Sequence, residues 1–109
     1  MIIQLCRLVR GVELSTTDIN GEAKSVLNNV IAIQANKDGA VFVDITAWGK
    51  TAENLAKYFK KGDALQIIGE LRNKKSKIDG KEITRVYILV TGFRFTYGNL
   101  NRAEQTHDD

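Results

Sequence analysis

One short segment of helical periodicity divides a chain whose other apolar segments have the features of β-strands. Ala52, Leu55, Ala56 and Phe59 recur at the spacing of one helix face, which predicts a helix of two to three turns. Thr51 is the predicted N-cap of this helix. The order of the strands around the helix therefore decides the fold class.

Three strand-like segments precede the helix, at residues 2–8, 26–35 and 40–48, and two follow it, at residues 64–72 and 83–90. Residues 93–96 are expected to close the sheet. Five strands with a helix between the third and the fourth are the order of an OB fold, an all-β Greek-key barrel. We expect one such domain at residues 1–96 and a short, polar, disordered tail at residues 97–109.

Three dipeptides predict turns: Asn20-Gly21, Asp38-Gly39 and Asp79-Gly80. The first lies in a polar segment, residues 11–23, to which no strand is assigned. The last lies at the tip of a segment, residues 73–82, that we interpret as a long basic loop between two strands.

The segment at residues 40–48 is the clearest strand because its side chains alternate in character. One face is predicted to lie in the core, and the other mixes charge, hydroxyl and large aromatic groups, which is unusual for a solvated face. The core face holds Val41, Val43, Ile45 and Ala47, and the other face holds Phe42, Asp44, Thr46 and Trp48.

Composition excludes several classes of protein. A length of 109 residues suits one domain, and a hydrophobic content of 43% is enough for one core. The single cysteine allows no intramolecular disulfide and fits a reduced, cytoplasmic location. No apolar run approaches the roughly 18 residues that a membrane span needs, and no secretory signal is present.

The residues needed for catalysis or metal binding are scarce. His107 is the only histidine and lies near the end of the chain, and Cys6 has the features of a small core residue. One cysteine and one terminal histidine cannot form a zinc site, and no glycine-rich phosphate loop is present. We therefore predict no enzyme activity, no metal and no cofactor.

Basic residues gather in one part of the chain. The net charge is only +3, but residues 50–85 hold ten basic and five acidic residues. Within residues 72–81, five basic residues are opposed by Asp79 alone. This pattern favours a polyanionic partner, although a solvated lysine-rich hairpin would show the same charges.

Aromatic and cationic residues together predict binding of single-stranded nucleic acid, because flat rings stack on unpaired bases while cations neutralise phosphates. Alternatively, Trp48 and Phe42 could fill a subunit interface. Tyr87, Phe93 and Phe95 are expected in the core or at its rim. The predicted binding residues are Trp48, Phe42, Lys50, Arg72, Lys74, Lys75, Lys77 and Lys81.

Residues 43–72 resemble the bacterial single-stranded DNA-binding protein family. The family pattern is a strand that ends in an aromatic residue before Gly-Lys, a helix of the form A-E-x-x-x-x-Y-x-x-K-G, and a strand that ends in G-x-L. The matching residues are Trp48-Gly49-Lys50, Ala52-Glu53, Tyr58, Lys61-Gly62 and Gly69-Glu70-Leu71.

The resemblance implies an OB fold that binds single-stranded DNA without sequence specificity. It also implies assembly as a homotetramer, with a dimer as the alternative. Trp48 falls where the family carries a base-stacking aromatic, and Phe42 falls near a second such position.

The chain also departs from the family. Gly11-Val12 replaces an Asp-Pro pair, and Ser76 and Arg85 stand where an aromatic residue and a glutamate are usual. The tail ends in Asp108-Asp109 without the family's long linker and acidic tip, so recruitment of replication and repair proteins through the tail is not expected.

The leading hypothesis is a non-enzymatic protein that coats exposed single-stranded DNA in replication, repair or recombination. Two alternatives stay open. One is an OB-fold interaction module, such as an accessory subunit of a replication-restart assembly. The other is a single-stranded RNA binder, because stacking does not depend on the 2′-hydroxyl.

Overall fold

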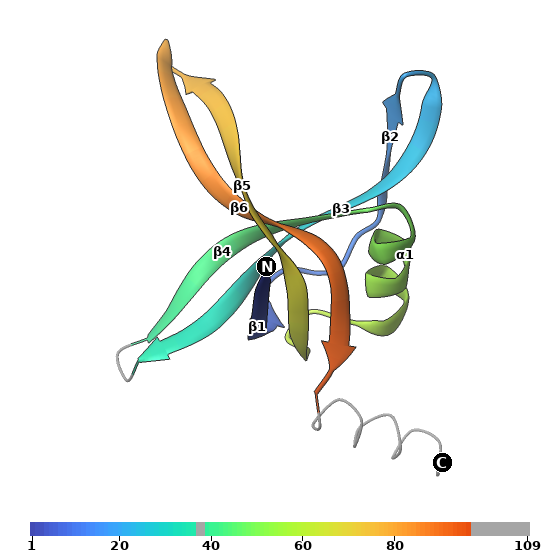
Figure 1. Cartoon of the computed structure of the whole chain (residues 1–109), viewed down its shortest axis with the longest axis vertical. Helices are drawn as coiled ribbons and strands as arrows, with labels where there is room; N and C mark the ends of the chain where they lie inside the picture. Colours follow the sequence, from blue (N-terminus) through green and yellow to red (C-terminus); the bar gives the residue numbers. More distant parts are fainter. Residues whose placement is uncertain (37–38, 97–109) are drawn as a thin grey trace.

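A computed structural model describes residues 1–36 and 39–96, which form six strands and one helix (Figure 1). The predicted tail at residues 97–109 and the turn residue Asp38 lie outside the described residues. The elements follow in the order β1 (Ile2–Leu8), β2 (Ser15–Ile19), β3 (Glu22–Asn36), β4 (Gly39–Trp48), α1 (Gly49–Tyr58), β5 (Ala64–Ile78) and β6 (Lys81–Phe95).

Five of the six strands close into a barrel. The sheet order is β1-β5-β6-β4-β3-β2, and a further pairing of β1 with β3 joins the ring. β4 and β6 run parallel, with Asp44 opposite Tyr87, and the other neighbours are antiparallel. The prediction of a five-stranded OB-fold barrel with a helix between its third and fourth strands is confirmed.

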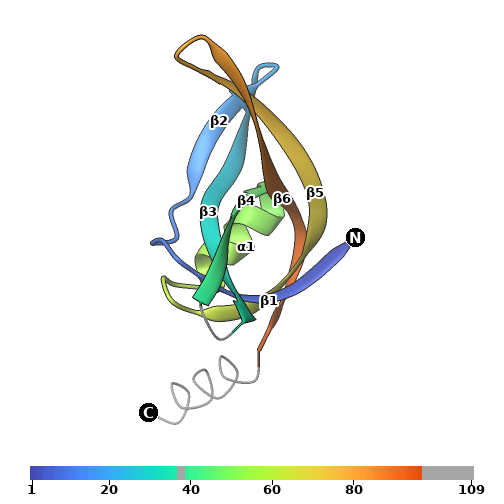
Figure 2. The ribbon, with the colours of Figure 1, turned by 90° about the vertical axis from the view of Figure 1, so that its left-hand side faces the viewer.

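Two hairpin arms leave the barrel at the same end (Figures 1 and 2). The β2–β3 arm comprises residues 15–26, and the β5–β6 arm comprises residues 73–86. Their tips are the predicted turns Asn20-Gly21 and Asp79-Gly80. All four turn residues have φ between 52° and 83°, as the tight two-residue hairpin turn requires.

The strands in these arms are where the sequence prediction was wrong. β2 was not predicted, and the segment at residues 73–82 is not a loop but the paired ends of β5 and β6. Both faces of each arm are largely exposed, so polar residues occupy both faces and no alternation marks the strands. The separate strand expected at residues 93–96 is the end of the continuous β6.

The helix begins three residues earlier than predicted. Trp48 rather than Thr51 occupies the N-cap position, and no side chain caps the helix there. Gly49 has a φ of +59°, a conformation that side chains disfavour, so glycine allows the chain to turn from β4 directly into α1. In the described part of the chain no helix is long and apolar enough to cross a membrane.

The core fills the barrel and the space between the barrel and α1. The predicted stripe residues Ala52 and Leu55 of α1 and Phe59 at its C-cap are buried. On the predicted core face of β4 the prediction holds for Ile45 and Ala47, but Val41 is exposed because β4 runs beyond the barrel toward the β3–β4 hairpin. The other core members are Cys6, Leu8, Leu27, Ile31, Leu65, Ile67, Ile88 and Val90.

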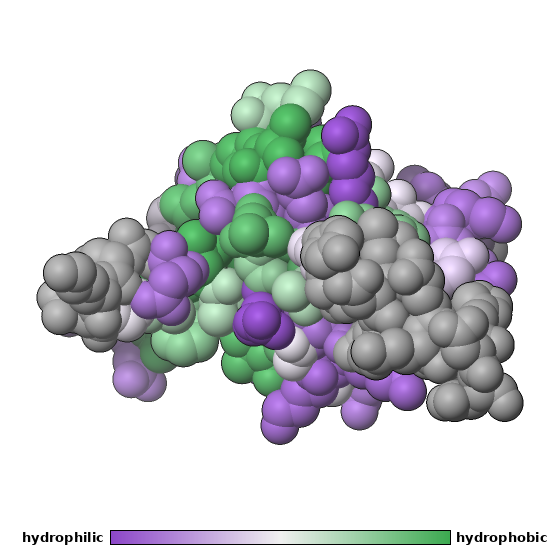
Figure 3. All heavy atoms as spheres, turned by 90° about the horizontal axis from the view of Figure 1, so that it is seen from below, coloured by the Kyte–Doolittle hydropathy of each residue, from purple (hydrophilic) through white to green (hydrophobic). Residues whose placement is uncertain are grey.

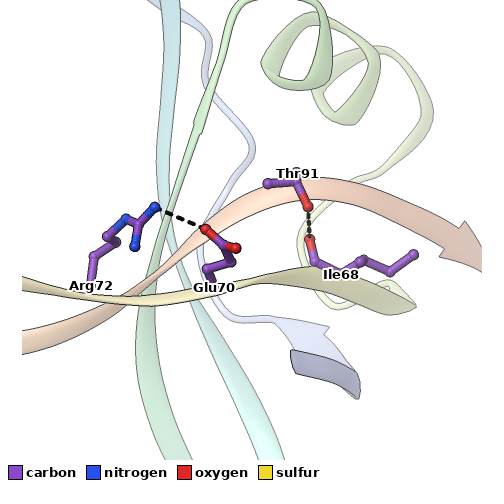
Figure 4. Close-up of polar contacts among 4 residues, drawn as sticks. All are labelled: Ile68, Glu70, Arg72 and Thr91. Carbon is purple, nitrogen blue, oxygen red and sulfur yellow. Dashed lines mark hydrogen bonds and ion pairs between the residues drawn. The ribbon is translucent and has the colours of Figure 1, made fainter. Parts of the chain in front are cut away.

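β6 carries a bulge where it crosses β5, because Thr91 is the extra residue opposite Ile68 and Gly69. The register of the two strands shifts between Ile68 and Gly69, and a Cβ added at Gly69 would lie 2.3 Å from the backbone oxygen of Leu89. The Thr91 hydroxyl donates a hydrogen bond of 3.3 Å to the Ile68 carbonyl at this point (Figure 4). Because a bulge bends its own strand, β6 and its partner β5 turn together away from the barrel and into the β5–β6 arm.

Candidate nucleic-acid interface

The outer face of β4 carries two exposed aromatic rings. Trp48 is 38% exposed and Phe42 is 64% exposed. They share a face because side chains alternate along a strand, while the neighbouring Ile45 and Ala47 point into the core. The two residues are six positions apart, which is a distance of about 20 Å along an extended strand.

Trp48 lies in a groove between the bases of the two arms. The groove has a volume of about 320 Å³ and takes residues from five strands, so the arms and the barrel build it together. Its lining residues are Thr17, Val26, Asn28, Thr46, Trp48, Asn73, Lys74 and Tyr87. We call it the tryptophan groove.

A second groove of about 410 Å³ continues from the first, since Asn28, Thr46, Lys74 and Tyr87 line both. We call it the basic groove because it adds two arginines. Together the two grooves form one polar channel across the outer face of β3, β4 and β6. The further residues of the basic groove are Arg10, Asn29, Asp44, Ile45, Ser76, Ile78 and Arg85.

Hydrogen bonds fix the floor of the channel. The Thr46 hydroxyl donates to Asn28 Oδ1 over 2.8 Å, across the β3–β4 pair. Asn29 is buried, and its Oδ1 accepts from the backbone N–H groups of Arg10 and Val30 at 3.1 and 2.7 Å. Asn29 Nδ2 also donates to the Arg10 carbonyl over 3.2 Å, so Asn29 holds the backbone of Arg10 beside the groove.

The predicted cations are not all equivalent. Lys74 lines both grooves, whereas the next residue, Lys75, points to the opposite face of β5 and lies 3.5 Å from Glu82. The guanidinium of Arg72 lies 2.8 Å from the carboxylate of Glu70, which offsets its charge (Figure 4).

The other three predicted cations line neither groove. Lys50 is exposed in the first turn of α1, and Lys77 and Lys81 are exposed beside the tip of the β5–β6 arm. The structure therefore brings together Trp48 and Lys74 from the predicted set. It adds Arg10 and Arg85, which the sequence analysis did not select.

Phe42 lies in a separate depression of about 420 Å³, which shares Asp44 and Arg85 with the basic groove. Its apolar neighbours there include Leu71 and Val86, both more than half exposed. The two predicted aromatic residues thus lie at different sites on one face, with Asp44 between them.

Four other aromatic residues pack against one another beside α1. Phe59 contacts Phe93 and Phe95 with ring centroids 5.2 Å apart, and Tyr58 lies 5.6 Å from Phe95. The prediction that Phe93 and Phe95 belong to the core or its rim is confirmed. Tyr87 is half-buried, as a rim residue would be, but it lines both grooves.

The described residues hold no group of three or more His, Cys, Asp or Glu side chains that could bind a metal ion. Cys6 is buried, and burial raises the pKa of its thiol to about 12, so it stays protonated near neutral pH. Grooves lined by rings, amides and cations suit binding rather than bond cleavage.

Comparison with known proteins agrees with this geometry. The profile of the single-strand binding protein family matches residues 2–96. Single-stranded DNA-binding protein 2 of Streptococcus agalactiae serotype V and single-stranded DNA-binding protein 1 of Streptococcus pyogenes serotype M6 are each 31% identical to this chain. In both cases the match covers 94% of this chain and 80% of the relative.

Solved structures of similar proteins share the fold. A deletion mutant of the single-stranded DNA binding protein from Thermus aquaticus superposes with a TM-score of 0.68 at 22% identity, over 86% of this chain and 39% of that chain. The SSB domain of a Synechococcus protein gives a TM-score of 0.65 at 16% identity, over 85% of this chain and 91% of that chain. By its sequence the chain belongs to the single-strand binding protein family.

Proposed function

We propose that this protein binds single-stranded DNA without sequence specificity, with bases stacked on Trp48 and Phe42 and phosphates held by Lys74, Arg10 and Arg85. The observation that carries the proposal is the exposed ring of Trp48 in a polar groove beside Lys74. Stacking tolerates every base because every base has a flat face. The protein is a binding protein and not an enzyme.

The arrangement favours unpaired strands over duplexes. A ring can stack on a base only when that base has left the base stack of its own strand. Asp44 adds a constraint, because its carboxylate lines the channel between the two rings and repels phosphate. Bases therefore face the sheet along β4, and the phosphates face the basic residues at the sides.

The same arrangement predicts how binding depends on salt. Phosphate contacts release counterions, so affinity falls as salt rises, with a slope of about 0.7 per contact for single strands. Arg72 and Lys75 contribute less than Lys74, because Glu70 and Glu82 already offset their charges. Lys50, Lys77 and Lys81 belong to the wider basic surface that attracts the strand.

β1 supports a homo-oligomer, with a tetramer or a dimer as the assembly. Residues 2–6 pair with β5 on one side only, so their other edge has no strand partner within the described residues. Met1, Ile3 and Leu5 are 55–91% exposed along this strand. Figure 3 shows hydrophobic atoms gathered on one side of the barrel, and a patch of this kind favours burial between subunits.

The biological role that follows is protection of exposed strands in replication, repair or recombination. A protein that binds only the unpaired form opposes re-annealing by mass action. Residues 1–96 are the binding unit in this proposal, and the unpaired Cys6 suits the reducing cytoplasm.

Fluorescence of Trp48 tests the proposal directly, because it is the only tryptophan of the chain. Titration with oligo(dT) should quench the emission, a duplex of equal length should quench weakly, and high salt should reverse the effect. Absence of quenching together with absence of a gel shift would reject DNA binding. An equal response to oligo(U) would extend the ligand class to RNA, and binding of a protein alone would favour the interaction module.

A further inference from the structure

Tyr87 occupies the gap between the two aromatic residues of β4. It lies on β6 and pairs with Asp44 in the parallel β4–β6 register. Asp44 is two residues from Phe42 and four from Trp48, which corresponds to about 7 Å and about 13 Å along β4. Three rings from two strands thus follow one line across the outer face of the sheet.

The surroundings of Tyr87 differ from those of the aromatic residues beside α1. Tyr87 makes no ring contact, and its hydroxyl makes no hydrogen bond, with any residue that the structure describes. A half-buried tyrosine usually finds a partner for its hydroxyl. The ring instead lines both grooves, at the point where they join.

Asn28 provides a polar group at the same point. Its Oδ1 accepts the Thr46 hydrogen bond of 2.8 Å, which sets the orientation of the amide. Nδ2 then carries two N–H donors that have no acceptor among the described residues. Asn28 lines the same two grooves as Tyr87, so a ring and an unused donor meet in one place.

We propose that Tyr87 and Asn28 form a third nucleotide subsite, in which the Tyr87 ring contacts a base and Asn28 Nδ2 donates to the edge of that base. This inference rests on the proposed function. The ligand here is a base rather than a phosphate, because the carboxylate of Asp44 lines the basic groove beside Tyr87. Every base offers an acceptor on an exposed edge, so the subsite stays tolerant of sequence.

The test compares Tyr87→Val with Tyr58→Ala. Valine suits a β-strand and removes the ring, and Tyr58 is a tyrosine outside the grooves that serves as the matched control. We expect Tyr87→Val to weaken binding of oligo(dT) about 5- to 150-fold, the range for loss of one stacked base, and Tyr58→Ala to leave the affinity unchanged. The slope of affinity against salt should stay the same in both, because no phosphate contact is removed.

Two further variants resolve the parts of the subsite. Tyr87→Phe keeps the ring and should weaken binding less than fivefold, and Asn28→Ala should weaken it by a similar amount. An oligo(dT) with one abasic residue, placed at successive positions, gives a second readout. At the position whose base contacts Tyr87, removal of the base should weaken binding to the native protein but should not weaken binding to Tyr87→Val any further. A double-mutant cycle shows a direct contact by this loss of additivity.

The outcomes separate this subsite from the proposed function. If Trp48→Ala weakens binding while Tyr87→Val binds as the native protein does, the subsite is rejected and the function stands. If the native protein binds no oligo(dT), both fail. If Tyr87→Val lowers the melting temperature, its weaker binding could reflect partial unfolding, and Tyr87→Phe and Asn28→Ala then serve as the test. Native affinity in both of these variants rejects the subsite.

Discussion

The aromatic residues of this protein are used in two opposite ways. Beside α1, Tyr58, Phe59, Phe93 and Phe95 contact one another at centroid distances of 5.2–6.0 Å. We call these four the packed cluster. On the outer face of β4 and β6, the rings of Phe42, Trp48 and Tyr87 make no ring contact with any described residue and line grooves instead.

The two sets of aromatic residues differ in what covers their rings. Phe59 at the centre of the packed cluster is 2% exposed and contributes to the free energy of folding, whereas Tyr58 and Phe95 are 47% and 43% exposed but contact neighbouring rings. Rings of the open face leave apolar surface in contact with water, and a flat ligand would bury that surface. A change in the packed cluster should therefore alter stability, and a change on the open face should alter binding.

The largest expected effect is on stability. Phe59→Ala removes a fully buried ring that contacts Phe93 and Phe95, and it should lower the free energy of unfolding by about 3–5 kcal/mol. Urea denaturation measures this loss. Affinity for oligo(dT), expressed per folded molecule, should not change. Phe59→Leu, which keeps most of the side-chain volume, should lose less stability. Weakened binding of oligo(dT) in that variant would show that the packed cluster also affects binding, contrary to the distinction between the two regions.

The open face should behave in the opposite way. Trp48→Ala should weaken binding of oligo(dT) by about 1–3 kcal/mol, the value of one stacked base, and change stability far less than Phe59→Ala does. Isothermal calorimetry measures the affinity, since this variant has no tryptophan to follow. Native affinity together with a large loss of stability would mean that Trp48 serves packing instead.

The barrel could be predicted from the sequence because its signals are local. The stripe of Ala52, Leu55 and Phe59 predicts the helix, and alternation along β4 separates Trp48 from Ile45 without knowledge of any partner strand. The arms could not be predicted as strands, because both of their faces are solvated and carry polar residues.

The channel could be predicted only in part. Trp48 and Lys74 follow from residue type and strand parity, but Tyr87 joins them through the parallel pairing of β4 with β6, across 43 positions of the chain. Asn28 and Arg10 join through the β3–β4 pair and the hydrogen bonds of Asn29. No local pattern encodes such pairings. Lys50 was predicted as a binding residue because it follows Trp48 closely in the sequence, but it lies on α1 and lines neither groove.

A smaller effect concerns pH and the core. Burial raises the pKa of Cys6 from 9.0 to about 12, so the unfolded chain loses this proton first as pH rises. The contribution of the protonated Cys6 thiol to the free energy of unfolding is fully present below about pH 9 and is lost progressively toward pH 12. Roughly 1 kcal/mol of stability should be lost by pH 10. Cys6→Ala should lose correspondingly less between pH 8 and pH 10 in urea denaturation, and an identical pH dependence in both proteins would contradict the assignment.

The smallest expected effect separates two adjacent lysines of β5. Lys74 lines both grooves, whereas Lys75 lies on the opposite face of β5 beside Glu82. Lys74→Ala should reduce the slope of log affinity against log salt by about 0.7, the value for one phosphate contact on a single strand. The measurement is a series of Trp48 fluorescence titrations at increasing salt.

Lys75→Ala is the control, because it removes the same charge from the same strand one residue away. Its slope should stay close to that of the native protein, since a screened, paired charge on the far face contacts no phosphate. Equal slopes for the two variants would mean that the β5–β6 arm acts through its total charge and that the grooves do not fix the path of the strand. A difference would place the phosphates along the same channel that Trp48 and Tyr87 line, and would extend the distinction between packed and open residues from the rings to the cations.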